Sequence, residues 1–289
     1  MDIIGKRKIW YLVSAAVLIP GAILLATAGL KLGIDFTGGS VVTVATDRPQ
    51  EDIRQIIREQ GVAEPTITST SDGYQARFTD DVRVEAALSD AEGVTVRRFE
   101  QVGPSISQDL AVNSLISLAA VSLAITLYVA FSFRKVPHPM RFGAMAIVAL
   151  LHDALFVLGL FSLLGVLMGV EIDAFIVTAV LTVIGFSVHD TIVVFDRLRE
   201  NLLRRSGSFP DIVNTSVNEV MGRSVNTSIT TVLVLLALLL FGGSATVTFV
   251  LALLLGMISG TYSSIFIAAP LLVTWHNSRD GGQKAPQQT

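Results

Sequence analysis

The chain alternates between long apolar runs and one segment of mixed character, and this pattern predicts a membrane protein with one domain outside the bilayer. Six apolar runs reach the length of about 18–20 residues that a spanning helix needs. They cover residues 9–30, 110–131, 142–168, 174–195, 224–241 and 246–275. The first run is too long for the core of a signal peptide and lacks a clear small-residue cleavage site, so it is predicted to be an uncleaved span.

The segment from residue 31 to residue 108 has a different pattern. Apolar and polar residues alternate as in strands near residues 41–44, 66–70, 74–79 and 94–99. Asp47–Gln60 and Asp80–Ala91 have helical spacing instead, and Ser71-Asp72-Gly73 reads as a hairpin turn. The order β-α-β-β-α-β predicts a small ferredoxin-like α+β domain between the first and second spans.

These patterns divide the chain into four parts. Residues 1–30 form the N-terminus and first span, 31–108 the domain, 109–276 the other five spans, and 277–289 a disordered tail. Between spans four and five, residues 196–223 are predicted to be a loop that forms two short helices on the membrane surface.

Charge predicts the orientation of the spans. Only 16% of residues are charged, against about 25% in soluble domains, and mean hydropathy is +0.63. All 13 Lys and Arg residues outside the domain lie in segments on one side of the membrane, including both ends of the chain. Because basic loops stay in the cytoplasm, both termini are predicted to be cytoplasmic and the domain extracytoplasmic.

The composition also excludes several classes of function. The domain has 8 basic and 13 acidic residues, which argues against binding of nucleic acid or anionic lipid. The chain has no cysteine, so disulfides, thiolate nucleophiles and cysteine-bound metals are excluded. It also has no G-x-x-x-x-G-K-[ST] motif, which argues against a nucleotide-driven pump.

The candidate chemistry lies in a set of ionisable residues within the spans. Asp190 interrupts the fourth run, where an ionised Asp costs at least about 2.5–3.5 kcal/mol. His189 precedes it, His152 and Asp153 lie in the third run, and Arg223 begins the fifth. Counting about 1.5 Å per residue from the basic ends places Asp190, one of the His152–Asp153 pair and the Arg223 guanidinium in one layer. Adjacent residues diverge by about 100°, so one member of each pair is expected to face a shared cavity.

Four interpretations of this set differ in their chemistry. In a proton relay, Asp190 binds and releases a proton as Arg223 moves away and returns. A metal site would need His152, Asp153, His189 and Asp190 to converge, which their divergence opposes. An intramembrane aspartyl protease would pair Asp153 with Asp190, but G-F-S-V-H-D lacks the G-x-G-D of such enzymes. In the fourth, Asp190 is hydrogen-bonded within the bundle and serves packing alone.

Several motifs together resemble a known family. G-I-D-F-T-G-G at residues 33–39, L-H-D at 151–153, I-G-F-S-V-H-D-T-I-V-V-F-D-R-L-R-E-N at 184–201 and M-G-R-S-V-N-T-S-I-T-T at 221–231 are similar to the SecF family of the bacterial Sec translocon. That family belongs to the RND superfamily. The resemblance covers nearly the whole chain and implies a six-helix, RND-type half with an extracytoplasmic domain.

The resemblance also implies a function and partners. It implies a non-enzymatic subunit of the bacterial inner membrane that, with SecD, uses the proton-motive force to promote preprotein translocation through SecYEG. YajC is a further implied partner, protons are the coupling ion, and no cofactor or metal is expected. The resemblance assigns proton transport to Asp190 and Arg223. The sequence differs from the family at His189, where the family usually has Asn. An alternative is an RND-type half-transporter that exports lipid or small hydrophobic molecules.

Overall fold

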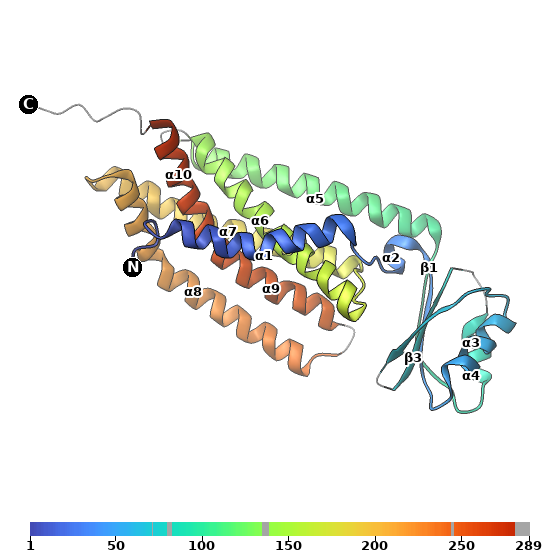
Figure 1. Cartoon of the computed structure of the whole chain (residues 1–289). Helices are drawn as coiled ribbons and strands as arrows, with labels where there is room; N and C mark the ends of the chain where they lie inside the picture. The colour runs from blue at the N-terminus through green and yellow to red at the C-terminus, as the bar shows by residue number, and fades with distance from the viewer. Residues whose placement is uncertain (71, 80–82, 135–138, 244–245, 281–289) are drawn as a thin grey trace, which may run out of the picture. The chain divides into compact units, whose positions relative to one another are not determined.

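The computed structural model describes residues 1–70, 72–79, 83–134, 139–243 and 246–280. The chain separates into two compact units (Figure 1). One comprises Met1–Lys31 with Ser117–Thr289, and the other is Leu32–Ile116. Each unit has its own buried core.

The membrane unit is built from long apolar helices. They are α1 (Arg7–Thr27), α5 (Pro104–Ser132), α6 (Pro139–Met168), α7 (Ala174–Arg204), α8 (Phe209–Phe241), α9 (Val247–Ser263) and α10 (Ala269–Asp280), with the π-helical turn η2 (Ser264–Ala268) joining the last two. Within the described residues, six helices are long and apolar enough to span a membrane, with α9, η2 and α10 counted as one. This confirms the predicted six-span fold.

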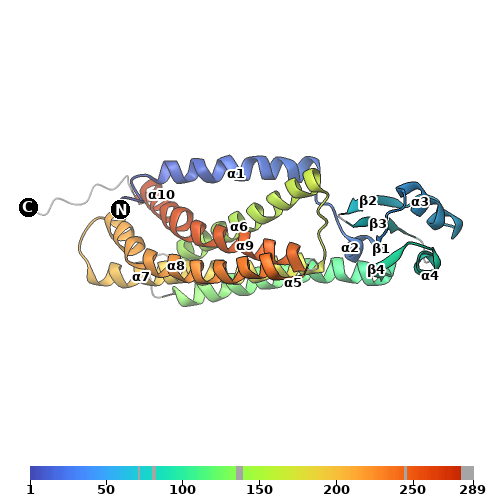
Figure 2. The same ribbon diagram turned by 90° about the horizontal axis from the view of Figure 1, so that it is seen from below.

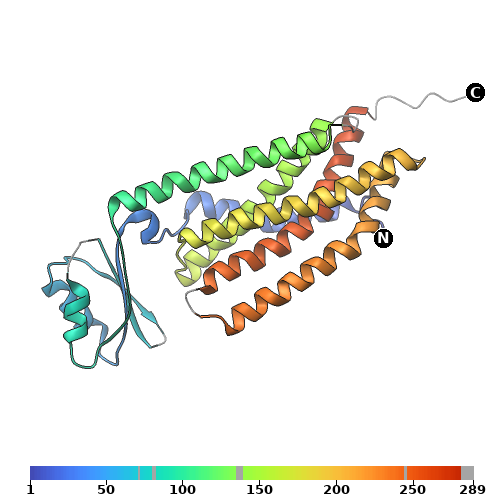
Figure 3. The same ribbon diagram turned by 180° about the vertical axis from the view of Figure 1, so that it is seen from behind.

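Helix α9 lies at the centre of this bundle. It packs against α6, α7 and α8, and Figures 2 and 3 show these helices running beside it. Glycines let the helices approach closely, since a Cβ on Gly256 would lie 2.2 Å from Val183 Cγ2 of α7. A Cβ on Gly159 of α6 would likewise lie 2.8 Å from the Gly21 Cα of α1.

The prediction of a loop with two short surface helices at residues 196–223 is wrong. Helix α7 continues without a break to Arg204 and α8 begins at Phe209, so only four residues separate them. Ion pairs one turn apart extend α7 beyond its apolar run, among them Arg204–Glu200 at 2.8 Å. Ser208 caps α8 by accepting a hydrogen bond from the Asp211 amide.

The tail predicted at residues 277–289 begins too early, because α10 continues to Asp280. The rest of the predicted tail, residues 281–289, lies outside the described residues.

The second unit contains a four-stranded sheet with two helices on one face (Figure 1). Its elements are α2 (Ile34–Thr37), β1 (Gly39–Ala45), α3 (Gln50–Glu59), β2 (Thr66–Thr70), β3 (Gly73–Phe78), α4 (Val84–Asp90) and β4 (Thr95–Val102). The strand order is β2-β3-β1-β4, and every neighbouring pair is antiparallel. This confirms the ferredoxin-like arrangement, although α4 begins later than predicted; Ser71 and residues 80–82 lie outside the described residues.

The buried core of this domain and the glycine turn that leads into β1 both follow from the sequence. Val42 and Val44 of β1 alternate inward and meet Ile53 and Ile57 of α3 in one buried cluster. The glycine pair at the start of β1 has positive φ angles of 70° at Gly38 and 108° at Gly39. A Cβ on Gly39 would lie 2.7 Å from the Phe78 carbonyl oxygen, so this turn needs glycine.

Candidate functional site

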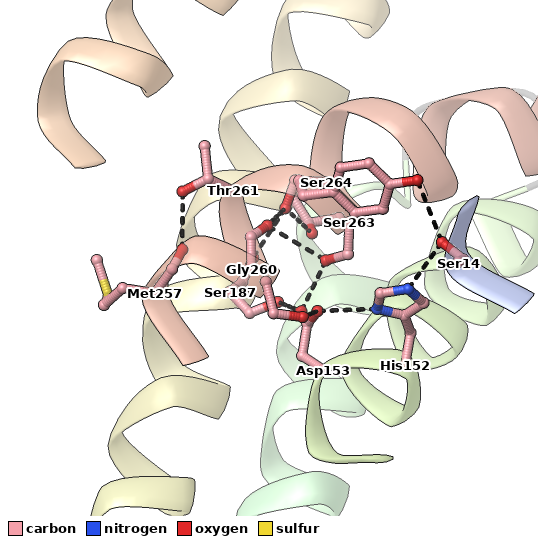
Figure 4. A network of polar contacts seen from close by, with 12 residues as sticks. Ser14, His152, Asp153, Ser187, Met257, Gly260, Thr261, Ser263 and Ser264 are labelled. Carbon is pink, nitrogen blue, oxygen red and sulfur yellow. Dashed lines mark hydrogen bonds and ion pairs between the residues drawn. The ribbon is translucent and has the colours of Figure 1, made fainter. Parts of the chain in front are cut away.

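Asp153 on α6 has four side-chain hydrogen-bond contacts among the residues that the structure describes. It is fully buried and accepts hydrogen bonds from hydroxyl groups on two neighbouring helices (Figure 4). The donors are Ser187 of α7 at 2.5 Å and Ser259 and Ser263 of α9 at 2.6 and 2.7 Å. A fourth contact joins its Oδ1 to His152 Nδ1 at 3.0 Å. Asp153 therefore links α6, α7 and α9.

His152 extends this network toward α1. Its Nε2 lies 3.0 Å from Ser14 Oγ, and the Ser14 hydroxyl donates to Tyr262 Oη at 3.3 Å. Tyr262 in turn donates to the Trp10 carbonyl oxygen at 2.8 Å. His152, Ser14 and Tyr262 line a cavity of about 190 Å³ between α1, α6 and α9. His152 faces this cavity, and its bond to Asp153 joins the two adjacent side chains in one network.

Asp190 on α7 lies in a separate and much sparser environment. Its side chain is 14% exposed and has two weak partners, the Thr261 hydroxyl at 3.4 Å and His189 Nδ1 at 3.7 Å. Asp190 lines a cavity of about 330 Å³ together with Phe186, Ser228 and Met257. The Asp190 carboxylate therefore has unused hydrogen-bonding capacity and open space beside it.

Arg223 lies on α8, one turn before Thr227 of the Asp190 cavity. It is exposed, and no ion pair joins it to Asp190 in the described part of the chain. Thr227, one turn further along α8, lines the Asp190 cavity and donates to the Arg223 carbonyl oxygen at 3.0 Å. The backbone of Arg223 is thus about 6 Å along the helix axis from the cavity wall.

His189 is the remaining residue of the predicted site. The His189 side chain is 70% exposed and contacts Asp190. Both residues line the same cavity, which differs from the expectation that one member of each pair would face it. Within the described residues, no three His, Asp or Glu side chains are grouped so that they could hold a metal ion. The two His-Asp pairs are therefore two distinct sites.

Sequence analysis missed the hydroxyl residues of these networks. They are Ser14, Ser187, Ser228, Ser259, Thr261, Tyr262 and Ser263. A signal was present, because Ser259 and Ser263 are one turn apart and so share one face of an apolar helix. Small hydroxyl residues are also common in helix contacts without chemistry, which is why the spacing alone did not assign them.

Comparison with known proteins identifies the family. Residues 83–278 match the family described as protein export membrane protein SecD/SecF, C-terminal. Residues 23–50 match the SecD/SecF GG motif, which includes Gly38 and Gly39. This chain belongs to the SecD/SecF family. Both predicted outcomes, the family and its fold, are thereby confirmed.

Individual members of the SecD/SecF family are similar along almost the whole chain. A protein translocase subunit SecF from Thermobaculum terrenum is 46% identical, with 96% of this chain and 94% of that protein covered. One from Anaerolinea thermophila is 40% identical, with the same two coverages. The protein translocase subunit SecDF of Bacillus subtilis is 34% identical, but only 38% of its length is covered.

Solved structures of SecDF show the same fold. The crystal structure of SecDF from Thermus thermophilus, described as a translocon-associated membrane protein, matches with a TM-score of 0.82 and 34% identity. A SecDF structure in a super-membrane-facing form matches with a TM-score of 0.69 and 33% identity. These matches cover 96% and 98% of this chain but 39% of each SecDF chain. The chain thus corresponds to a part of those longer proteins.

Proposed function

We propose that this chain is a SecF-type, proton-coupled subunit that works with a SecD partner to promote preprotein movement through SecYEG. Membership of the SecD/SecF family supports the role in protein export. The observation that carries proton coupling is Asp190, a carboxyl group inside an apolar helix that faces a cavity with only two weak partners. An intramembrane carboxyl group in such a place is suited to binding and releasing a proton.

The proposed cycle has two arrangements of Asp190. In the arrangement of this structure, Arg223 is away from the cavity, which favours a neutral, protonated Asp190. In the other, α8 brings the Arg223 guanidinium to Asp190 and the proton is released. A proton crossing the membrane potential supplies about 2.3 kcal/mol per 100 mV, which would drive the change.

The chain acts in this scheme without catalysing a covalent reaction. Protons are the coupling ion, and neither a cofactor nor a metal is required. The proposed setting is the bacterial inner membrane, with both termini cytoplasmic and residues 31–108 outside. YajC is a proposed further partner of the complex.

Orientation can be tested with single cysteines, because the chain has none of its own. Ser69 lies on the exposed side of the domain and Ser206 between α7 and α8. We expect an impermeant thiol reagent to label Ser69→Cys from the outside of intact cells, and Ser206→Cys only after lysis. Labelling of Ser206→Cys in intact cells would contradict the proposed topology.

Partnership can be tested by purification. The Asp190 cavity and exposed apolar residues such as Phe186 would be covered by a second, homologous six-helix chain. We expect the tagged chain to copurify with SecD in mild detergent. A chain that elutes alone as a stable monomer from cells containing SecD would contradict this.

Function itself is tested by export into inverted membrane vesicles. Vesicles with the chain should export more of a slow-folding substrate when a proton gradient is imposed. Vesicles lacking the chain should export the same amount with and without the gradient. Equal stimulation in both preparations would show that the chain does not couple export to protons.

A further inference from the structure

The Asp153 network has the donor count of an ionised carboxylate. Two of its four contacts reach Oδ1, from His152 and Ser259, and two reach Oδ2, from Ser187 and Ser263. A carboxylate has no hydrogen to donate and room for about four hydrogen bonds. The Ser187 and Ser259 hydroxyls donate to Asp153, and the Ser263 hydroxyl lies 2.7 Å from Asp153 and 3.2 Å from the Gly260 carbonyl oxygen. Together with His152 these groups can occupy all four acceptor positions of an ionised carboxylate.

A buried carboxylate within a membrane bundle is stabilised by a neighbouring cation and by hydrogen-bond donors. His152 is the only group contacting Asp153 that can carry a positive charge, among the residues the structure describes. The other titratable groups that face the pair are Tyr262 of α9 and Asp190 of α7, and neither supplies a positive charge. Helix α1 contributes the neutral hydroxyl of Ser14. The balance of charge thus depends on His152.

The hydrogen bonds on the far side of His152 have a fixed direction. The Trp10 carbonyl oxygen can only accept, so the Tyr262 hydroxyl must donate its single hydrogen there. Tyr262 Oη then accepts from Ser14, which uses the single hydrogen of Ser14. Ser14 must therefore accept from His152, and the ring nitrogen Nε2 carries a hydrogen.

Both ring nitrogens of His152 are then hydrogen donors. Nε2 donates to Ser14 and Nδ1 donates to the ionised Asp153 carboxylate. An imidazole ring with two N–H groups is the charged imidazolium form. The direction at Nε2 follows from the hydrogen bonds of Ser14 and Tyr262, and the direction at Nδ1 follows from the ionised state of Asp153.

We propose that His152 and Asp153 form a second proton-binding site, separate from Asp190, in which a buried imidazolium–carboxylate pair holds one proton. When this proton leaves to the aqueous phase, Nε2 becomes an acceptor and Ser14 turns its hydroxyl hydrogen toward it. Tyr262 then loses its donor from Ser14 but keeps its own hydrogen bond to the Trp10 carbonyl oxygen, so one of these two hydrogen bonds between Tyr262 and α1 is lost. The release of one proton thus weakens the contact between α1 and α9, and in the chain α1 is followed by the domain that begins at Leu32.

This inference deepens the proposed function, because a proton-driven subunit would use the second site to couple the bundle to α1. The site itself does not depend on export, so it can be observed separately. The suitable measurement is nitrogen-15 NMR of histidine rings in the full chain with its SecD partner in lipid nanodiscs. The His152 signals are the ones lost in a matched His152→Gln sample, which separates them from the three other histidines.

The expected result is an imidazolium signal from His152 at about pH 8, where only about 3% of ordinary imidazole is protonated. Asp153→Asn should remove this signal, because the counter-charge is lost. Tyr262→Phe should reduce it, because Ser14 is then free to donate to Nε2. Ser162→Ala should leave it unchanged, since Ser162 lies on the same helix and donates to the Gly29 carbonyl oxygen instead.

A neutral His152 at about pH 8 in the unmodified chain would overturn the inference, as would an imidazolium signal that survives both Asp153→Asn and Tyr262→Phe. Tyr262→Phe removes one oxygen atom, so it also provides the test if Asp153→Asn does not fold. Asp190→Asn should keep the His152 signal. If Asp190→Asn retains gradient-driven export while the signal persists, the proposed function fails and this inference stands.

Discussion

Replacing Asp190 by Asn is expected to abolish the gradient-dependent part of export and to leave the complex assembled. Asn has the size of Asp and can still accept a hydrogen bond from Thr261, which lies 3.4 Å from the carboxylate. It cannot bind or release a proton. The expected yield of a slow-folding substrate in inverted vesicles is therefore the same with and without an imposed gradient. Full stimulation in this variant, at normal amounts of complex, would make Asp190 a packing residue.

Two further variants separate proton binding from shape. Asp190→Glu still titrates and should retain part of the stimulation, because the cavity of about 330 Å³ beside Asp190 leaves room for one more methylene. Arg223→Met should lose stimulation to a similar extent, since no guanidinium could then approach and release the proton. If Asp190→Glu loses as much stimulation as Asp190→Asn, the shape of the side chain rather than its ability to bind a proton would be what export requires.

His189 provides a control on the same helix. It is 70% exposed and lies at the rim of the cavity, so His189→Asn should preserve gradient-dependent export. We expect at most a change in the pH at which export is greatest, because histidine is the side chain that ordinarily titrates near neutrality. Loss of the gradient-dependent stimulation of export in His189→Asn would show that His189 is part of the proton-binding site.

A second large effect is expected at Gly256, where α9 meets α7. A methyl group at this position would lie 2.2 Å from Val183 Cγ2 and 2.9 Å from Val183 Cβ, and Val183 is buried. Gly256→Ala should therefore force the two helices apart and destabilise the bundle by about 1–3 kcal/mol. The measurement is the apparent melting temperature of the purified complex, followed by the fraction that stays monodisperse after heating.

Controls for Gly256 come from the chain itself. Gly143 of α6 has no atom within 4 Å of the position its Cβ would occupy, so Gly143→Ala should leave the melting temperature unchanged or raise it slightly. Val183→Ala removes the clashing methyl groups and should restore part of the stability of Gly256→Ala. Equal melting temperatures for the Gly256→Ala and Gly143→Ala chains would contradict the close α7–α9 contact.

Much of the fold could be predicted because it depends on local periodicity. Six long apolar runs specify six spans, and strict alternation around the Asp72–Gly73 turn specifies a hairpin in the domain. The failure at residues 196–223 has a local cause as well. Polar residues such as Arg197 and Glu200 indicate the end of a span but do not end a helix, since their side chains pair along its surface.

The site could be predicted only in part. Asp190, Asp153 and His152 were identified because ionisable residues in apolar runs are rare. The positions of Ser259 and Ser263 beside Asp153 depend on α9 lying at the centre of the bundle, which no single-helix pattern reveals. The depth of Arg223 could be counted along the chain, but the direction of its side chain depends on how α8 is rotated.

The central claim is that protons pass through Asp190 when a preprotein is exported. The most direct test is the rate at which a proton gradient collapses in inverted vesicles that contain the complete complex, followed with a pH-sensitive dye. Addition of a substrate for export should accelerate the collapse with the unmodified chain and have no effect with Asp190→Asn. Equal substrate-dependent acceleration by both chains would contradict the claim.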